Sequence, residues 1–139
     1  MLQQLRQHSQ SAYPNECCGV LLGNLVDGER QVKSVFPCSN ALDSLEGEGA
    51  RAYFIPPEQL ISAQKLARET GCDIVGFYHS HPDEAARWSE RDLREAHWFA
   101  CSYVITSVER GLPTRTQSYV LAGTSEQDKR FDDEQIVTT

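Results

Sequence analysis

Positive charge is scarce in this sequence. Its 13 lysines and arginines are outnumbered by 20 aspartates and glutamates, which leaves a net charge of −7 at pH 7. Proteins that bind nucleic acids by neutralising phosphates need clusters of lysine and arginine, and the sequence contains no such cluster. We therefore expect no nucleic-acid partner.

Long apolar runs are also missing. No window approaches the roughly 18 apolar residues of a membrane-spanning helix, so we expect no membrane partner. Residues 1–14 have neither the apolar segment nor the small-residue cleavage site of a signal peptide. These features predict a cytoplasmic protein.

Cysteine pairs of the C-x-x-C type are absent as well. The five cysteines are an odd number, and together with the missing export signal this predicts free, mostly buried thiols in a reducing compartment. A cysteine-rich zinc site is therefore not expected. Cys17 and Cys18 would point to opposite faces of a strand, so that one of them could line a site.

The apolar residues that are present follow the periods of both helices and strands. We expect helices in residues 1–13, from Pro57 to Gly71 and in 89–100. We expect strands on both sides of an Asp27-Gly28 turn within 17–39, and in 72–80, 102–109, 114–123 and, more weakly, 130–139. Residues 40–52 predict a loop. The fold class is therefore α/β: a single domain, residues 1–139, with a mixed central β-sheet flanked by helices.

Two of the four histidines stand one residue apart in GFYHSHPDEAARWSERD, residues 76–92. Residues two apart on a strand face the same side, so His79 and His81 can reach one point while Ser80 points away. Pro82 then ends the strand, which places the pair at a strand tip. Two imidazoles on one face suit Zn²⁺. The alternative is a half-exposed strand with nothing bound.

Asp92 lies eleven residues after His81, where a loop could fold its carboxylate back over the strand tip. His79, His81 and Asp92 would make three protein ligands and leave a fourth position for water, as in catalytic zinc sites. SERD, residues 89–92, is also a capping-box pattern with Ser89 as N-cap, and that interpretation needs no metal. The two interpretations are partly compatible, because a helix start is a rigid place for a ligand.

Two further residues would complete a hydrolytic site. A zinc hydrolase needs a general base, and the candidate is Glu16, which precedes an apolar strand. Ser89 could donate its hydroxyl to the oxyanion that forms when water attacks a carbonyl. Neither residue stands out alone, because an acid before a buried strand is common.

NECC before an apolar strand, then HSHP, then SERD, resembles the pattern of the JAMM, or MPN+ (Mov34/MPN/PAD-1), zinc metallopeptidases. That pattern is an upstream Glu, then H-x-H-P, a spacer and S-x-x-D. The ten residues between His81 and Asp92 match the spacer. The likeness to the compact, stand-alone bacterial members extends over nearly the whole chain. Trp88 departs from it, since many relatives carry Pro there, but the departure leaves the ligands intact.

The resemblance implies an MPN/JAMM-like fold, with layering like that of cytidine deaminases, and one Zn²⁺ per chain. It implies that His79, His81 and Asp92 bind the metal together with a water. It also implies that Glu16 activates this water and then protonates the leaving amine, and that Ser89 is the oxyanion donor.

The resemblance further implies a zinc metallopeptidase that hydrolyses a peptide or isopeptide bond. The substrate would be a ubiquitin-like or sulfur-carrier protein, cleaved after its C-terminal Gly-Gly. The alternative is a non-catalytic module of the same fold that binds a ubiquitin-like partner, and hydrolysis of a small amide is a third interpretation. The sequence indicates no particular oligomeric state.

Overall fold

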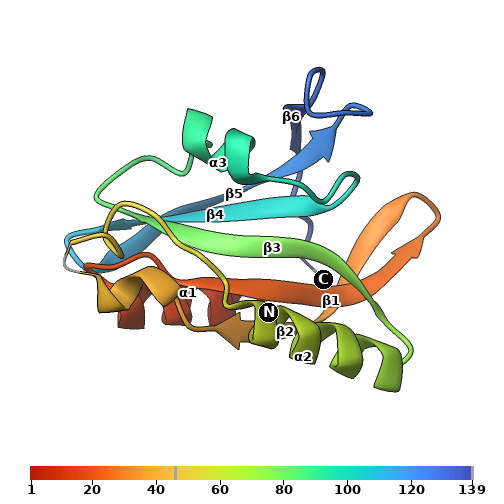
Figure 1. Cartoon of the computed structure of the whole chain (residues 1–139), viewed down its shortest axis with the longest axis horizontal. Coiled ribbons are helices and arrows are strands. Elements are labelled where there is room, and N and C mark those ends of the chain that lie inside the picture. Colours follow the sequence, from red (N-terminus) through yellow and green to blue (C-terminus); the bar gives the residue numbers. More distant parts are fainter. Residues whose placement is uncertain (46, 139) are drawn as a thin grey trace.

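The computed structural model describes residues 1–45 and 47–138, and within them six strands pair into one mixed sheet in the order β2-β1-β3-β4-β5-β6 (Figure 1). The strands are β1 (Cys18–Val26), β2 (Glu29–Cys38), β3 (Asp73–Pro82), β4 (Ser102–Glu109), β5 (Leu112–Ala122) and β6 (Arg130–Glu134). The helices are α1 (Leu2–Ala12), the 3-10 helix η1 (Ala41–Ser44), α2 (Pro57–Glu69) and α3 (Glu90–Glu95). β3 and β4 run parallel, and the other neighbouring strands run antiparallel.

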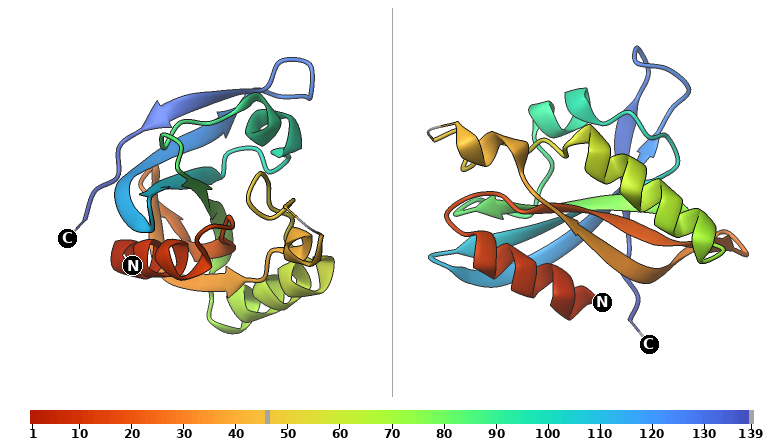
Figure 2. Two further views of the ribbon diagram at one scale, coloured as in Figure 1. Left: turned by 90° about the vertical axis from the view of Figure 1, so that its left-hand side faces the viewer. Right: turned by 60° about the horizontal axis from the view of Figure 1, so that its bottom comes forward.

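Side chains of the sheet divide between two apolar cores, one on each face. Cys18 and Val20 of β1 belong to the larger core, whereas Cys17 and Leu21 belong to the smaller one. α2 packs on the larger core through its buried alanines, and α1 reaches the smaller core through Leu5. Figure 2 shows α1 and α2 on different sides of the twisted sheet. The expectation that the two adjacent cysteines face opposite ways is confirmed.

The central position of β3 explains its apolar sequence. β3 lies between β1 and β4, and residues 75–81 are all buried. A strand covered on both faces is built from a continuous apolar run. Gly76 is needed where the pairing with β4 begins, because a Cβ there would lie 2.6 Å from the Ser102 carbonyl oxygen. The buried part of the strand thus leads directly to its C-terminal end, where His79 and His81 lie.

Most of the expected elements are present. The helix expected in residues 1–13 is α1, and the hairpin between β1 and β2 turns at Asp27 and Gly28, which both have positive φ. α2 begins at Pro57, and Gly71 follows it with φ +70°, as a left-handed helix end favours. None of the helices in the described residues is long and apolar enough to cross a membrane.

The helix expected in residues 89–100 is wrong in length, because α3 ends at Glu95. Ala96 adopts an extended conformation, and the Lys129 ammonium donates to its carbonyl at 2.8 Å. Trp98 then packs edge-on against Phe77 of β3. Tertiary contacts therefore end the helix after fewer than two turns.

Two other expectations need correction. The loop expected in residues 40–52 contains η1, whose N-cap Asn40 accepts the Leu42 N–H with its side chain; Glu46 lies outside the described residues. The strand expected in 130–139 is wrong after Glu134, where β6 ends, and Thr139 lies outside the described residues. Residues 135–138 carry no partner strand in the sheet.

Candidate metal centre

The end of β3 brings two imidazoles together. His79 and His81 face the same side of the strand, and their Nε2 atoms are 3.2 Å apart. Ser80 between them turns to the other side, where its Oγ accepts the Cys17 N–H at 2.8 Å. The strand period of two residues accounts for both directions.

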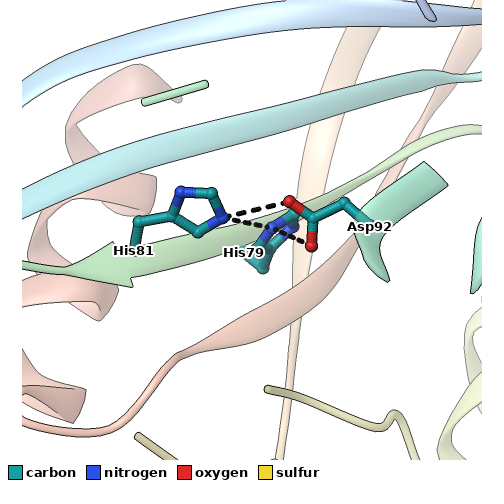
Figure 3. Close-up of side chains that lie close together, drawn as sticks. All are labelled: His79, His81 and Asp92. Carbon is teal, nitrogen blue, oxygen red and sulfur yellow. Dashed lines mark hydrogen bonds and ion pairs between the residues drawn. The ribbon is translucent and has the colours of Figure 1, made fainter. Parts of the chain in front are cut away.

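Asp92 of α3 closes a triangle with the two rings. Its Oδ1 lies 3.3 Å from His79 Nε2, and its Oδ2 lies 3.1 Å from His81 Nε2. Figure 3 shows the rings and the carboxylate pointing toward one another. Tetrahedral zinc holds nitrogen and oxygen ligands at about 2.0–2.1 Å, which places the ligand atoms about 3.3 Å from one another. Each ring faces a different oxygen of the carboxylate at about this separation, and one ligand atom from each of the three residues lies within 4.8 Å of the other two. The three groups are therefore close enough to hold one zinc ion.

The same carboxylate caps α3. The Asp92 N–H donates to Ser89 Oγ at 3.0 Å, and the Ser89 N–H donates to Asp92 Oδ2 at 2.9 Å. The capping box that competed with a metal site in the sequence is therefore present. It does not exclude ligation, because Oδ1 takes no part in the cap. The cap instead holds the carboxylate in the rotamer that faces the histidines.

Neighbouring groups also hold the two rings. The Nδ1–H of His81 donates to the Ala85 carbonyl at 2.9 Å, so that in the neutral ring Nε2 is the bare nitrogen that a metal requires. Tyr53 stacks on His79, with ring centroids 4.5 Å apart and an interplanar angle of 25°. Nδ1 of His79 is buried without a hydrogen-bond partner in the described part of the chain.

Burial and charge set the protonation of the triangle. Burial lowers the pKa of His79 despite the nearby Asp92 carboxylate, so this ring is neutral at pH 7, as a metal ligand must be. Burial also opposes protonation of His81, but the hydrogen bonds with Asp92 and Ala85 raise the pKa of that ring. Although burial works against ionisation of Asp92, its contacts with the two rings hold the pKa of the carboxyl well below the usual range.

Glu16 is a buried acid whose ionisation is opposed chiefly by burial and is also affected by His81 and Asp92. Its side chain is 6% exposed, and its Oε1 has no hydrogen-bond partner in the described residues. Burial raises the pKa of the carboxyl from 4.5 to about 8, while His81 lowers it and Asp92 raises it. A carboxyl that gains or loses its proton near neutral pH suits general acid–base chemistry. The unpartnered oxygen fits a site that receives a polar ligand such as water.

Ser89 lies at the exposed edge of the same site. Its Oγ accepts the Asp92 N–H, so the hydroxyl proton remains available for donation. Ser89 can therefore cap α3 and donate a hydrogen bond outward at the same time.

The remaining candidates are not suited to this chemistry, although Cys18 lies directly opposite His79 in the pairing of β1 with β3. Cys17 is buried in the smaller core, and Cys18 contacts the Ser39 carbonyl in the larger one. Burial raises the pKa of both thiols, which disfavours a thiolate nucleophile. His97 is exposed and pairs with Glu126 at 3.3 Å.

Sequence reasoning missed three groups that support the site. These are the Ala85 carbonyl behind His81, the Tyr53 ring on His79, and the Asn40 side chain that donates to the Glu16 carbonyl at 3.1 Å. No side-chain pattern marks them, because the Ala85 group is a backbone carbonyl and the other two act through contacts between segments far apart in sequence. An Asn two residues after the end of a strand is the one signal that could have drawn attention, and it is a weak one.

The fold and the donor set define the class. Two imidazoles and a carboxylate at the tip of a central strand, beside a buried acid of raised pKa, are the groups of a metal-dependent hydrolase. Residues 1–122 match the family described as prokaryotic homologs of the JAB domain. The chain belongs to this family, and the expected likeness to JAMM/MPN enzymes is confirmed.

Similar proteins agree with this assignment. The chain is 35% identical over 107 residues to desampylase from Haloferax volcanii, covering 77% of this chain and 73% of that protein. It is 34% identical over 98 residues to the probable TtuB-protein conjugate cleaving protease from Thermus thermophilus, covering 70% of this chain but only 60% of that protein's length. A JAB1/MPN domain protein from Archaeoglobus fulgidus has the same fold, with a TM-score of 0.55 and 17% identity over 99% of this chain and 90% of that one.

Proposed function

We propose that the chain is a zinc-dependent peptidase that cleaves a peptide or isopeptide bond after the C-terminal Gly-Gly of a ubiquitin-like or sulfur-carrier protein. In this proposal residues 1–139 form one metallopeptidase domain with one Zn²⁺. The observation that carries it is the cluster of His79, His81 and Asp92, in which the two rings lie 3.2 Å apart and each faces a different carboxylate oxygen at 3.1–3.3 Å. Five free thiols favour work in a reducing compartment such as the cytoplasm.

The names of the relatives support the substrate class. One relative is named a probable TtuB-protein conjugate cleaving protease, and another is named desampylase. The C-terminal tail of a ubiquitin-like protein is a chain end and is less ordered than a segment within its fold. An enzyme can therefore reach the tail more readily than such a segment. An extended Gly-Gly tail has no side chains to exclude it from a narrow site, and such a tail can pair its main chain with a sheet edge.

His79, His81 and Asp92 would hold the zinc ion. Bound there, zinc would supply a Lewis acid for the scissile carbonyl and lower the pKa of water. The chain's own part is to keep the His79 ring uncharged through burial, to hold His81 through its Nδ1 against the Ala85 carbonyl so that Nε2 faces the site, and to keep Asp92 ionised.

Glu16 would move the protons. Its carboxylate takes a proton from the attacking water, and the resulting carboxylic acid gives that proton to the leaving amine, so the residue ends the cycle as it began. In the metal-free chain burial raises the pKa of this carboxyl to about 8, and a pKa near neutral pH suits a group that both takes up and gives back a proton. Ser89 would donate its hydroxyl to the negative charge that develops on the carbonyl oxygen.

A matched pair of substrates tests the proposal. The first is a ubiquitin-like domain whose C-terminal Gly-Gly is joined to a short peptide or to a lysine side chain, and the second is the same short sequence as a free peptide. The zinc-loaded chain should cleave the first, and Glu16→Gln should retain zinc but lose turnover. Cleavage of the free peptide at the same rate would favour a small amide as substrate. No cleavage of either, with binding of the ubiquitin-like domain unchanged by Glu16→Gln, would support the non-catalytic module.

A further inference from the structure

The side chain of Asn40 is a buried junction with all its hydrogen-bonding capacity in use. Nδ2 donates to the carbonyls of Glu16 and Ala52 at 3.1 and 2.9 Å, and Oδ1 accepts the N–H groups of Leu42 and Phe54 at 3.0 and 3.1 Å. An amide has two donor hydrogens and two acceptor lone pairs. The reversed amide would face two N–H donors with its own N–H groups, so the orientation is dictated by the partners.

The position of Glu16 in the fold depends on the loop of residues 40–49. Glu16 precedes β1, which begins at Cys18, so the sheet ladder does not hold its peptide groups. Its N–H donates to the Gly49 carbonyl at 2.7 Å, and its carbonyl accepts from Asn40. Both peptide groups of the candidate base are thus bonded to residues 40–49.

The same loop also reaches the metal triangle. The segment that leads from η1 to α2, drawn in yellow, passes in front of β3 in Figure 1, and its Tyr53 stacks on His79. The two neighbours of Tyr53 in sequence, Ala52 and Phe54, are both bonded to the Asn40 side chain. One side chain therefore connects the backbone of Glu16 to the segment that packs on His79.

We propose that Asn40 is a positioning residue of this enzyme: by bonding to Glu16 on one side and to the Tyr53 segment on the other, its amide sets the carboxyl of Glu16 against the histidine pair. Asn40 does not touch the reacting atoms. The inference rests on the proposed function, since it assigns Asn40 to the reaction that Glu16 would serve. A displacement of a catalytic group by about 1 Å can lower a rate by about 10²-fold.

Asn40→Asp tests this role, because the two side chains have the same shape. Asp keeps an acceptor for Leu42 and Phe54 but cannot donate to Glu16 and Ala52. Asn24→Asp is the matched control, because Asn24 donates a single hydrogen bond, to the Gly71 carbonyl at 3.1 Å, at the far end of β1. Asn40→Ser is a second variant, which removes the amide without burying a charge and keeps the test valid if Asn40→Asp does not fold.

Three quantities separate positioning from a purely structural role. We expect Asn40→Asp and Asn40→Ser to bind zinc at the native ratio, to lose about 10²-fold in kcat, and to change KM by less than about threefold. Hydrogen exchange of the Glu16 amide, measured on the zinc-free and the zinc-loaded protein, should accelerate at least about tenfold in both variants. Asn24→Asp should match the native chain in kcat and in exchange at Glu16.

The failures are distinguishable. If the native chain cleaves the conjugate and the folded Asn40 variants keep kcat within about twofold and the native Glu16 exchange, the positioning role is overturned while the proposed function stands. If the native chain cleaves no conjugate, the proposed function fails. The exchange data then still test whether the Asn40 side chain holds the backbone of Glu16. Unchanged protection of the Glu16 amide in the Asn40 variants would show that it does not.

Discussion

Ser89 and Asp92 hold each other at the start of α3, each donating its backbone N–H to the other's side chain at 2.9 and 3.0 Å. Asp92 Oδ2, which receives one of these bonds, also lies 3.1 Å from His81 Nε2. A helix cap and a candidate metal ligand are therefore one carboxylate. The cap holds the ligand in place before any metal binds, which reduces the ordering that binding requires.

Substitution of Ser89 should separate its two roles. Ser89→Ala removes the side-chain cap, which costs about 1 kcal/mol, and also removes the proposed oxyanion donor, which lowers kcat by about 10²–10³-fold. Ser89→Thr keeps a hydroxyl and should retain most of both. Unfolding curves, zinc content and kcat measured side by side check this. Native kcat in Ser89→Ala would remove Ser89 from the reaction, and a loss of zinc would make it a support for Asp92 alone.

Glu16 should make the stability of the zinc-free chain depend on pH. Its pKa is about 8 in the folded state against 4.5 ordinarily, so the folded chain holds a proton that the unfolded chain releases. The stability of the native chain relative to Glu16→Gln should therefore fall as pH rises from about 4.5 to about 8 and then level off. Urea unfolding of both chelator-treated proteins across this window measures the difference. The titration of His81 contributes to it as well, because the Glu16 carboxylate raises the pKa of that ring. Parallel curves would show that Glu16 has an ordinary pKa.

Local patterns were enough to predict the strands and the histidine pair. The apolar run of β3 and the two-residue spacing of His79 and His81 are properties of a short stretch of chain, and both survive in the fold. The end of α3 and the supports of the site could not be predicted in this way. Lys129 ends α3 from 33 residues away in sequence, and Asn40 reaches Glu16 across 24 residues. Such contacts depend on the three-dimensional arrangement of all the elements.

The Arg30–Glu134 contact should contribute to stability without affecting the site. Arg30 of β2 pairs with Glu134 of β6, whose carboxylate also accepts from Ser102 and Ser118. Glu134→Ala would leave the buried hydroxyls of Ser102 and Ser118 without their acceptor and should cost about 2 kcal/mol. Asp132→Ala is the control on the same strand, because Asp132 pairs with Arg130 at an exposed position and its loss should cost less than about 0.5 kcal/mol.

Urea unfolding measures both costs, and zinc content should be native in both variants. Equal costs for Glu134→Ala and Asp132→Ala would show that the Arg30–Glu134 contact contributes no more than an exposed ion pair. A loss of zinc in Glu134→Ala would show instead that this contact supports the metal triangle.

Zinc bound per chain tests the central claim most directly. It should be measured in the native chain, in His81→Ala and in His97→Ala, each purified without added metal and again after zinc is supplied to the folded protein. His97 is the matched control, since it is exposed and pairs only at the surface with Glu126 among the described residues. We predict close to one zinc in the native chain and in His97→Ala, and little in His81→Ala. A folded native chain that binds no zinc even when it is supplied would contradict the account and would leave Asp92 as a helix cap alone.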